Sequence, residues 1–379
     1  MSPASSSDLR AALRARAAEL GFAWAGFASA APVPRAAAFM DWLGAGHHAG
    51  MGWLARAPAR RTDPGRVLPG LGGVVVLGWA LAYDEPDPAV WQDPLRGRIA
   101  RFAWGPDYHD IIGAPLAVFA ADLARWSGGQ CRAYVDTGPL LEHELAWTAG
   151  LGFLGRNALL IHPDGGSWLH LAVILTTARL PPDVPTEAAG AVWRGVRANG
   201  RAVTASCGAC RRCLAACPTG ALAKPYQVDA RSCLSYWTIE SRTVIPAECL
   251  GAANRWVFGC DDCQSICPWN RRLDRADVRP AAVQRVPFEP ARCAPRLADL
   301  LRMNETQFKE IFAASGLLRT GLARLRRNAV AALATPSVPG APDLIAEALR
   351  HPDPLTRAQA QVVRLKRRSE EEAQTPVQA

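Results

Sequence analysis

The sequence predicts an α+β fold in three parts, joined by a linker and ending in a tail. In residues 1–185 the helix-like "LLEHELAWTA" follows closely on "AYVD", which reads as a strand, so this part is predicted to be an α+β domain. Residues 204–290 hold a cysteine run with the spacing of bacterial ferredoxins. Residues 291–368 repeat apolar side chains with a helical period and are predicted to form HEAT-like α-helical repeats. Residues 186–203 are a predicted linker or insertion, and residues 369–379 a disordered acidic tail.

The composition is that of a folded protein with more than one domain. Of the 379 residues, 49% are hydrophobic and 20% are charged. The formal net charge of +9, from 43 basic and 34 acidic residues, permits a polyanionic partner without identifying one. We find no hydrophobic signal segment, and the longest apolar runs are too short and too rich in glycine to span a bilayer. We therefore expect a cytoplasmic protein without membrane contact.

The N-terminal part carries polar residues at places where a cleft could form. "AYVD" ends in Asp136 and a Gly-Pro pair breaks the chain behind it, so the carboxyl either faces a cleft or caps the next helix. In "GPDYHD", Tyr108 and His109 could carry protons, and each could equally pack and cap. "GLGFLG" matches the dinucleotide fingerprint, but it follows a helix and precedes a strand, so we interpret it as a close-packing turn.

Most of the 11 cysteines fall into two related runs, C-x2-C-x2-C-x3-C-P and C-x2-C-x3-C-P. In a cytoplasmic protein, clustered cysteines are more often metal ligands than disulfides. The first pattern is that of a two-cluster ferredoxin, in which the last cysteine of a run binds the other [4Fe-4S] cluster. Cys233, between the runs, can supply the thiolate that the second run lacks. The predicted ligands of cluster 1 are Cys207, Cys210, Cys213 and Cys267, and those of cluster 2 are Cys217, Cys233, Cys260 and Cys263.

Structural zinc is the alternative to iron–sulfur clusters. It prefers paired C-x2-C knuckles with four thiolates per ion, and it leaves the x3-C-P halves of both runs unexplained. The remaining cysteines, Cys131, Cys249 and Cys293, are predicted to be ordinary buried thiols.

Four arginines gather in the C-terminal part. Arg319, Arg324, Arg326 and Arg327 have no acidic residue between them. They form either a solvated helix face or a surface for nucleic-acid phosphates. Because only about two helical repeats fit, fewer than a free-standing solenoid needs, we expect this part to pack against the ferredoxin-like domain.

Together these segments resemble the epoxyqueuosine reductase family, cobalamin-dependent iron–sulfur enzymes of tRNA modification. The resemblance rests on "ARFAWGPDYH", "VDTGPLLE", "CGACRRCLAACPTGAL", "SCLSYWTIE" and "CDDCQSICPWN", which spread over most of the chain in family order. It implies that the epoxide of epoxyqueuosine at the tRNA wobble position is reduced to queuosine, with [4Fe-4S] clusters passing electrons to cobalamin. The family's cluster ligands fall on the cysteines assigned above.

The resemblance also implies roles for single residues and partners. Asp136 would protonate the epoxide oxygen and contact cobalamin, beside a substrate pocket lined by Asp107, Tyr108 and His109. The expected partners are the anticodon stem-loop of a tRNA carrying epoxyqueuosine and an external flavodoxin- or ferredoxin-type electron donor, with the chain acting as a monomer. The other implied cobalamin contacts are Arg61, Asp261 and Gln264, and the implied tRNA contacts are Arg242, Arg319, Arg324, Arg326 and Arg327.

The sequence departs from the family pattern at a few places. Arg156 stands where the family usually has a lysine, in "GKN", and Leu171-Ala172 stand where it has a Gly-Glu pair, which puts a hydrogen bond from that glutamate in doubt. The insertion before the first cysteine run is expected to be a surface excursion or linker; its arginines are a less favoured set of tRNA contacts. A corrinoid iron–sulfur reductive dehalogenase and a non-catalytic two-cluster electron carrier are the alternative functions.

Overall fold

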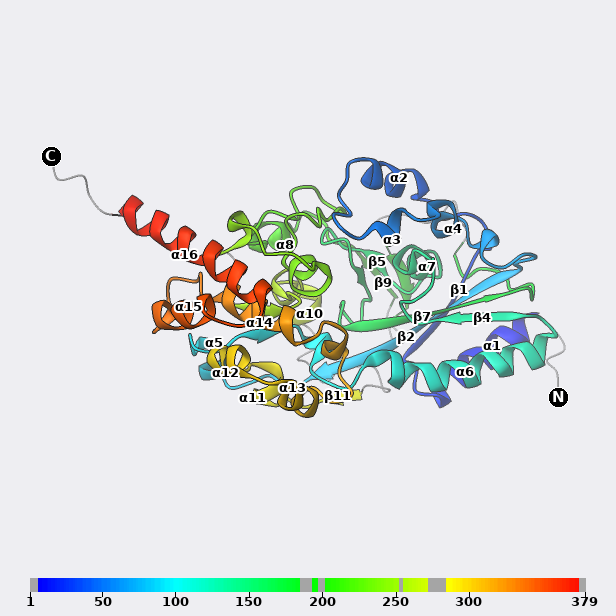
Figure 1. Ribbon diagram of the computed structural model, residues 1–379. Coiled ribbons are helices and arrows are strands. Elements are labelled where there is room, and N and C mark those ends of the chain that lie inside the picture. The colour runs from blue at the N-terminus through cyan, green and yellow to red at the C-terminus, as the bar shows by residue number, and fades with distance from the viewer. Residues whose placement is uncertain (1–5, 185–192, 197–201, 252–254, 272–283, 375–379) are drawn as a thin grey trace.

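The computed structural model describes residues 6–184, 193–196, 202–251, 255–271 and 284–374. A sheet covered by helices lies at the N-terminal end of the molecule, and long helices lie at the C-terminal end (Figure 1). The cysteine-rich part lies between them, so it contacts both neighbours (Figure 1).

The N-terminal part is built on an antiparallel sheet. Its strands pair in the order β1 (Trp24–Ala28), β2 (Gly73–Tyr83), β7 (Leu169–Thr176) and β4 (Cys131–Tyr134), and β11 (Gln284–Val286) pairs with the end of β2. Strand β2 contains the apolar run "GVVVLGWALA". Successive side chains of a strand point to opposite faces, so Val74 and Val76 enter one core cluster while Val75 and Leu77 enter another.

Helices cover both faces of this sheet. On one face α1 (Ser6–Glu19) and α6 (Tyr108–Ser127) pack against β1, β2 and β7. On the other face α7 (Glu142–Thr148) packs with the loop that precedes β2. The shorter elements are α2 (Ala36–Gly44), α3 (Gly52–Ala55), α4 (Pro58–Thr62), η1 (Pro64–Arg66), α5 (Pro88–Gln92), β3 (Arg98–Ile99), η2 (Arg101–Ala103), β5 (Phe153–Leu154) and β6 (Leu160–Ile161).

The cysteine-rich part consists mainly of loops and short helices. Strand β10 (Trp256–Phe258) pairs in parallel with β3, and β11 pairs in parallel with β2. Backbone hydrogen bonds therefore join this part to the N-terminal domain at two places. Its helices are α8 (Arg212–Ala216), the π-helix η4 (Tyr236–Glu240), η5 (Ala247–Cys249), α9 (Asp262–Ser265) and α10 (Pro268–Arg271).

The predicted linker or insertion forms a β-hairpin where the structure describes it. Strands β8 (Trp193–Val196) and β9 (Ala202–Ala205) pair antiparallel. The Trp193 indole packs with Phe153 and Ile161, and its Nε1–H donates to the Gly150 carbonyl at 2.7 Å. Partial burial of this large side chain anchors the hairpin to the N-terminal domain, so the segment is an insertion packed on that domain rather than a free linker.

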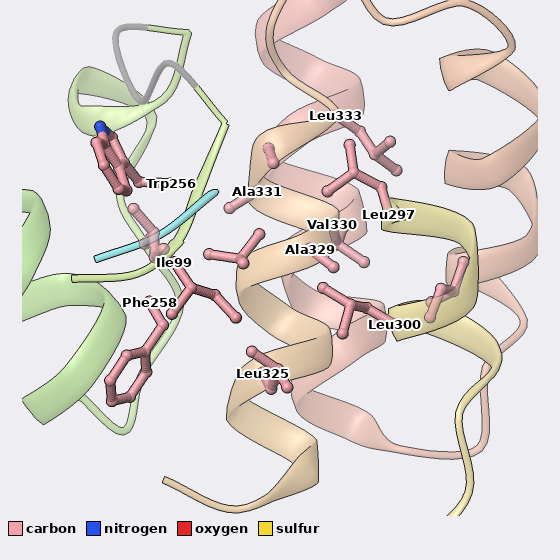
Figure 2. Close-up of a cluster of buried hydrophobic side chains, with 14 of the residues drawn as sticks. Ile99, Trp256, Phe258, Leu297, Leu300, Leu325, Ala329, Val330, Ala331 and Leu333 are labelled. Carbon is pink, nitrogen blue, oxygen red and sulfur yellow. The ribbon is translucent and has the colours of Figure 1, made fainter. Parts of the chain in front are cut away.

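The C-terminal part is helical, as predicted, and packs against the cysteine-rich part. Figure 2 shows Leu325 and Ala329 of α14 between Ile99 and Phe258 on one side and Leu300 of α12 on the other. One apolar core thus runs from β3 and β10 into the C-terminal helices. Their HEAT-like arrangement stays a prediction. The helices are α11 (Pro290–Cys293), α12 (Leu297–Arg302), α13 (Glu305–Ile311), η8 (Gly316–Arg319), α14 (Leu322–Ala332), α15 (Ala341–Leu349) and α16 (Pro354–Gln374).

The prediction of disorder from residue 369 onward is wrong for residues 369–374. Helix α16 continues to Gln374, and Lys366 Nζ lies 2.9 Å from Glu370 Oε1 one turn later. Such pairs, with the helix propensity of Glu and Ala, extend the helix into the acidic segment. Residues 375–379 lie outside the described residues. Neither α16 nor any other helix in the described ranges is long and apolar enough to cross a membrane.

Candidate active site

Asp136 lies in the turn after β4, where the backbone adopts an unusual conformation. Its φ of +55° is in the left-handed region that residues with side chains rarely adopt and that often marks functional sites. Its N–H donates to Glu142 Oε1 at 3.1 Å, and its Oδ2 accepts from the Tyr108 hydroxyl at 2.7 Å. The exposed carboxyl is therefore held by Tyr108 of α6 and the Asp136 backbone by Glu142 of α7, and the carboxyl does not cap α7, whose N-cap is Leu141.

The start of α6 brings together the three residues predicted to line the substrate pocket. Asp107 caps the helix by accepting from the His109 N–H at 3.1 Å, and its Oδ1 lies 2.6 Å from His109 Nδ1. The Tyr108 ring stacks on His109 and on His170, with ring centroids 4.1 and 4.0 Å apart. Burial, and then the charge of Asp136, raises the pKa of Tyr108 well above its ordinary value. Tyr108 is therefore a neutral donor to Asp136 near pH 7.

A cavity of about 410 Å³ opens beside Asp136, and we call it the main cavity. Arg61 lies in its wall, 8% exposed, with its guanidinium 5.2 Å from the Trp53 ring centroid. Within the described residues, Arg61 Nε and Glu144 Oε2 are buried without a hydrogen-bond partner. A largely apolar cavity with a few unpaired polar groups is typical of a cofactor site. Its apolar lining includes Phe39, Trp42, Trp53, Leu54, Leu140, Leu141 and Leu154.

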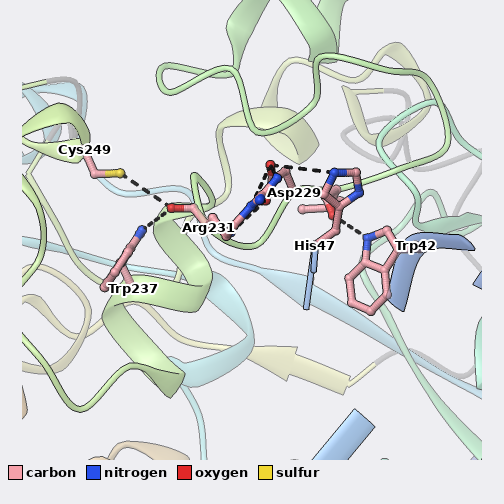
Figure 3. A network of polar contacts seen from close by, with 7 residues as sticks. Trp42, His47, Asp229, Arg231, Trp237 and Cys249 are labelled. Atoms are coloured by element: carbon pink, nitrogen blue, oxygen red, sulfur yellow. Dashed lines mark hydrogen bonds and ion pairs between the residues drawn. The ribbon is translucent and has the colours of Figure 1, made fainter. Parts of the chain in front are cut away.

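The cysteine-rich part closes one wall of the main cavity with residues 226–228. Trp42 Nε1–H, from the N-terminal domain, donates to the Val228 carbonyl at 2.7 Å. Next along the chain, Asp229 pairs with Arg231 at 2.7 Å, and the Arg231 carbonyl accepts from Trp237 Nε1–H at 2.7 Å (Figure 3). This network fixes the loop that precedes Cys233, so the main cavity lies between the two domains.

A smaller cavity of about 150 Å³ shares His143 with the main cavity. Gln264 lines it from the cysteine-rich part and accepts from the Ser167 hydroxyl at 2.8 Å. His170 lines it as well, and burial, followed by the charge of His109, lowers the pKa of His170 to about 4. His170 is thus a neutral ring that supports Tyr108.

Asp261, a predicted cobalamin contact, is not among the residues that line either cavity, and neither are Asp107, Tyr108 and His109. The carboxyl of Asp261 is 2% exposed and accepts from the Arg101 N–H at 2.8 Å. Burial raises the pKa of Asp261 to about 6, although the Arg101 N–H opposes the shift. The side chain instead fastens the second cysteine run to η2.

The structure brings several of the predicted cluster ligands close to one another, and their assignment to two clusters stays a prediction. Burial, followed by Cys207 and Cys267, raises the pKa of the Cys213 thiol. Burial and Cys233, with further contributions from Asp261, Cys213 and Cys217, raise the pKa of the Cys263 thiol. A small cavity, here the cluster-1 cavity, is lined by Cys207, Cys210, Cys213 and Cys267. Four thiols that line one cavity are the donor set that a [4Fe-4S] cluster takes when they are deprotonated, so these residues fit predicted cluster 1. Of the other thiols, Cys249 and Cys293 are buried and Cys131 is half-buried.

Comparison with known proteins identifies the family. A family profile described as epoxyqueuosine reductase QueG, DUF1730, matches residues 61–137, and one for a 4Fe-4S double cluster binding domain matches residues 206–270. The epoxyqueuosine reductase of Gloeobacter violaceus is 39% identical over 333 residues, which cover 85% of this chain and 95% of that protein. The chain belongs to the epoxyqueuosine reductase family. The Escherichia coli epoxyqueuosine reductase is 32% identical over 317 residues, which cover 83% of this chain and 78% of that protein.

Solved structures of epoxyqueuosine reductases share the fold. One is a crystal structure of epoxyqueuosine reductase with a tRNA-Tyr epoxyqueuosine-modified tRNA stem loop. Its protein is 27% identical in sequence to this chain, and the two superpose with a TM-score of 0.79 over 96% of this chain and 91% of that chain. A structure of the Bacillus subtilis epoxyqueuosine reductase, with a catalytic aspartate loop swung out of the active site, has the same identity, TM-score and coverage.

The arginines predicted to bind tRNA differ in exposure, and Arg327 cannot contact RNA. It is 0% exposed and its guanidinium donates to backbone carbonyls of residues 237–243. Arg324 and Arg326 are half-buried and also donate to backbone carbonyls. Arg242 and Arg319 are exposed. A count of charges along the sequence cannot separate these cases, because it does not register burial.

Sequence reasoning missed Glu142, His143 and His170, which complete the surroundings of Asp136 and Tyr108. The signals were present. Glu142 and His143 directly follow the "VDTGPLL" segment, and His170 is a lone titratable residue within the apolar strand "LHLAVILT". A titratable residue within an otherwise apolar, buried strand is an informative exception, and here its ring stacks on that of Tyr108.

Glu142→Gln should stabilise the protein increasingly as pH rises. Burial, and then the charge of Asp136, raises the pKa of Glu142 to about 8 from an ordinary 4.5. Between these values the unfolded chain loses the proton that the folded chain keeps, so wild-type stability falls as pH rises. Glutamine keeps an oxygen for the Asp136 N–H and never ionises. We expect equal unfolding free energies near pH 5 and a gain on the order of 1–2 kcal/mol near pH 8, reduced for partial exposure. Urea unfolding at both pH values checks this, and a pH-independent difference would contradict it.

Proposed function

We propose that this chain reduces the epoxide of epoxyqueuosine in tRNA to queuosine. The observation that carries the proposal is the carboxyl of Asp136, held 2.7 Å from a neutral tyrosine hydroxyl at the rim of a cavity lined by both domains. Family membership and the relatives' names support the substrate. The net reaction takes in two electrons and two protons and releases the epoxide oxygen as water.

We further propose that the main cavity holds cobalamin, and its lining fits such a group. Arg61 Nε and Glu144 Oε2, which lack partners in the described part of the chain, would meet amide groups of the corrin's edge. The aromatic wall with Trp42 and Trp53 would face its apolar surface. When bound, cobalamin supplies low-potential reducing chemistry that no side chain can provide. Gln264 would approach from the smaller cavity.

Asp136, in its protonated form, is the proposed proton donor to the epoxide oxygen, and its proton is one of the two that the net reaction takes in. Opening the ring without a proton would leave a poorly stabilised alkoxide, so a positioned acid contributes about a hundredfold or more. The Tyr108 hydroxyl and Glu142 orient the carboxyl through side chain and backbone. In the Bacillus subtilis enzyme a catalytic aspartate loop occurs swung out of the active site. We propose that the Asp136 turn is its counterpart, since two hydrogen bonds alone hold the carboxyl group and the Asp136 N–H in the described structure.

Electrons would enter from an external donor and pass through the two clusters. We propose the ligand sets given above, which the proximity of Cys213 to Cys207 and Cys267 supports. Arg242 and Arg319, both exposed, are the proposed contacts to the phosphates of the stem-loop. A wobble base must be splayed out of the loop to reach the cavity, as recognition of single-stranded RNA allows.

Deletion of the gene tests the proposed function in the cell. Mass spectrometry of nucleosides from tRNA of the deletion strain should show accumulated epoxyqueuosine and no queuosine, and the wild-type gene should restore queuosine. Unchanged queuosine would overturn the substrate assignment. The Asp136→Asn gene should fail to restore it, which separates an enzyme from a simple electron carrier.

A further inference from the structure

The turn between β5 and β6 separates the main cavity from the cluster-1 cavity. Leu154 and Ala158 line the main cavity, whereas Arg156 and Asn157 line the cluster-1 cavity. The Ala158 N–H closes the turn by donating to the Gly155 carbonyl at 2.9 Å. Two consecutive side chains of one short turn are therefore directed toward the cysteine ligands.

Asn157 is buried in this turn with half of its amide unused. The side chain is 3% exposed, and its Oδ1 accepts from the Leu159 N–H at 3.4 Å. This bond fixes which end of the amide is oxygen. The other end, Nδ2, is buried and has no hydrogen-bond partner among the residues that the structure describes. A buried donor left unpaired costs about 1–3 kcal/mol, so a ligand with acceptor atoms is expected beside it.

The acceptor that fits is sulfur. The Arg156 N–H already donates to Cys207 Sγ at 3.4 Å, and the Arg156 guanidinium donates to the Gly208 carbonyl at 2.7 Å, within the loop between Cys207 and Cys210. The turn thus supplies N–H groups to the sulfur-lined cavity from both backbone and side chain. Hydrogen bonds to sulfur are a main determinant of the potential of an iron–sulfur cluster.

We propose that Asn157 is a positioning residue that donates a hydrogen bond from Nδ2 to a sulfur atom of cluster 1 and thereby raises its reduction potential. The bond is stronger to the reduced cluster, which carries one more negative charge, so it favours the reduced state. This inference rests on the proposed cluster ligands.

Asn157→Ser is the discriminating variant. Serine keeps an oxygen that can accept from the Leu159 N–H in an equivalent turn, but it is too short to reach the cluster. Asn304→Ser, at the N-cap of α13, is the matched control, because serine caps a helix as well as asparagine does. Both are compared with wild type as anaerobically purified full-length protein.

Redox titration followed by electron paramagnetic resonance should resolve two midpoints. In Asn157→Ser one midpoint should fall by about 59 mV, a tenfold change for a one-electron couple, while the other midpoint and the iron content stay unchanged. Asn304→Ser should shift neither midpoint. Unchanged midpoints in Asn157→Ser at full iron content would overturn the proposal and leave Asn157 as a turn residue.

A second measurement covers the case in which the variant loses iron. Wild-type protein labelled with [¹⁵N]asparagine should show a hyperfine coupling between an asparagine nitrogen and a reduced cluster in pulsed electron paramagnetic resonance. Absence of this coupling would overturn the proposal. Neither measurement requires tRNA or cobalamin. A protein that binds no iron would instead overturn the proposed function itself.

Discussion

Asp136→Asn is expected to lower turnover of epoxyqueuosine in tRNA by about a hundredfold or more. The amide has nearly the shape of the carboxyl but cannot supply a proton to the epoxide oxygen. Asparagine tolerates the left-handed backbone that gives Asp136 its φ of +55°. Its oxygen can still accept from the Tyr108 hydroxyl, which lies 2.7 Å from Asp136 Oδ2. The turn should therefore stay in place while proton transfer is lost.

Single-turnover assays with a modified stem-loop measure this effect, and nucleoside mass spectrometry gives the product. Iron content and cobalamin absorbance show that the variant is fully loaded. Asp343→Asn, in the exposed first turn of α15, is the matched control and should have wild-type turnover. If Asp136→Asn turned over at the wild-type rate with full cofactor occupancy, Asp136 would not be the acid.

Arg327→Met is expected to destabilise the protein by about 4 kcal/mol. The guanidinium is fully buried and donates to the carbonyls of Trp237, Ser241 and Thr243 and to Asn328 Oδ1. Methionine fills much of the space but leaves these acceptors without donors, at about 1–3 kcal/mol each, with partial relaxation. Because residues 237–243 follow Cys233, the loss should also weaken retention of cluster 2.

Arg319→Met is expected to weaken binding of the stem-loop and to leave the stability of the protein almost unchanged. Its side chain is 62% exposed, so the unfolding free energy should change by about 0.5 kcal/mol or less. Binding of the stem-loop should weaken and depend less steeply on salt, since one phosphate contact is lost. Denaturant unfolding and filter binding of both variants check the two assignments. Equal effects of the two variants on stability would contradict them.

Much of the fold follows from local patterns. The run at residues 73–83 becomes the central strand β2, buried on both faces, because every second side chain enters a different core. The spacing of Cys207, Cys210 and Cys213 places three thiols in one short loop, and the structure lines one cavity with these three and with the distant Cys267. The hairpin at Trp193 was missed because proline, alanine and glycine dominate that segment, whereas one tryptophan decides its packing.

The site was less predictable because its contacts join distant segments. The sequence indicates Asp136 as a candidate site residue because a Gly-Pro pair follows it closely. Its hydrogen bond to Tyr108, however, depends on how α6 packs on the sheet. Asp261 directly follows Cys260 in the sequence, and its bond to the Arg101 N–H depends on how η2 packs against the second cysteine run. Arg327 belongs to a run of arginines, and only its buried place in α14 separates it from its exposed neighbour Arg319.

The central claim is that this chain uses its own clusters and cobalamin to remove the epoxide oxygen from a tRNA nucleoside. The most direct measurement is anaerobic incubation of the reconstituted full-length protein with an epoxyqueuosine-containing stem-loop and a chemical reductant, followed by nucleoside mass spectrometry. We expect queuosine, lighter by one oxygen atom, only when iron, sulfide and cobalamin are all present. Epoxyqueuosine that survives with the fully loaded protein, or queuosine formed without cobalamin, would contradict it.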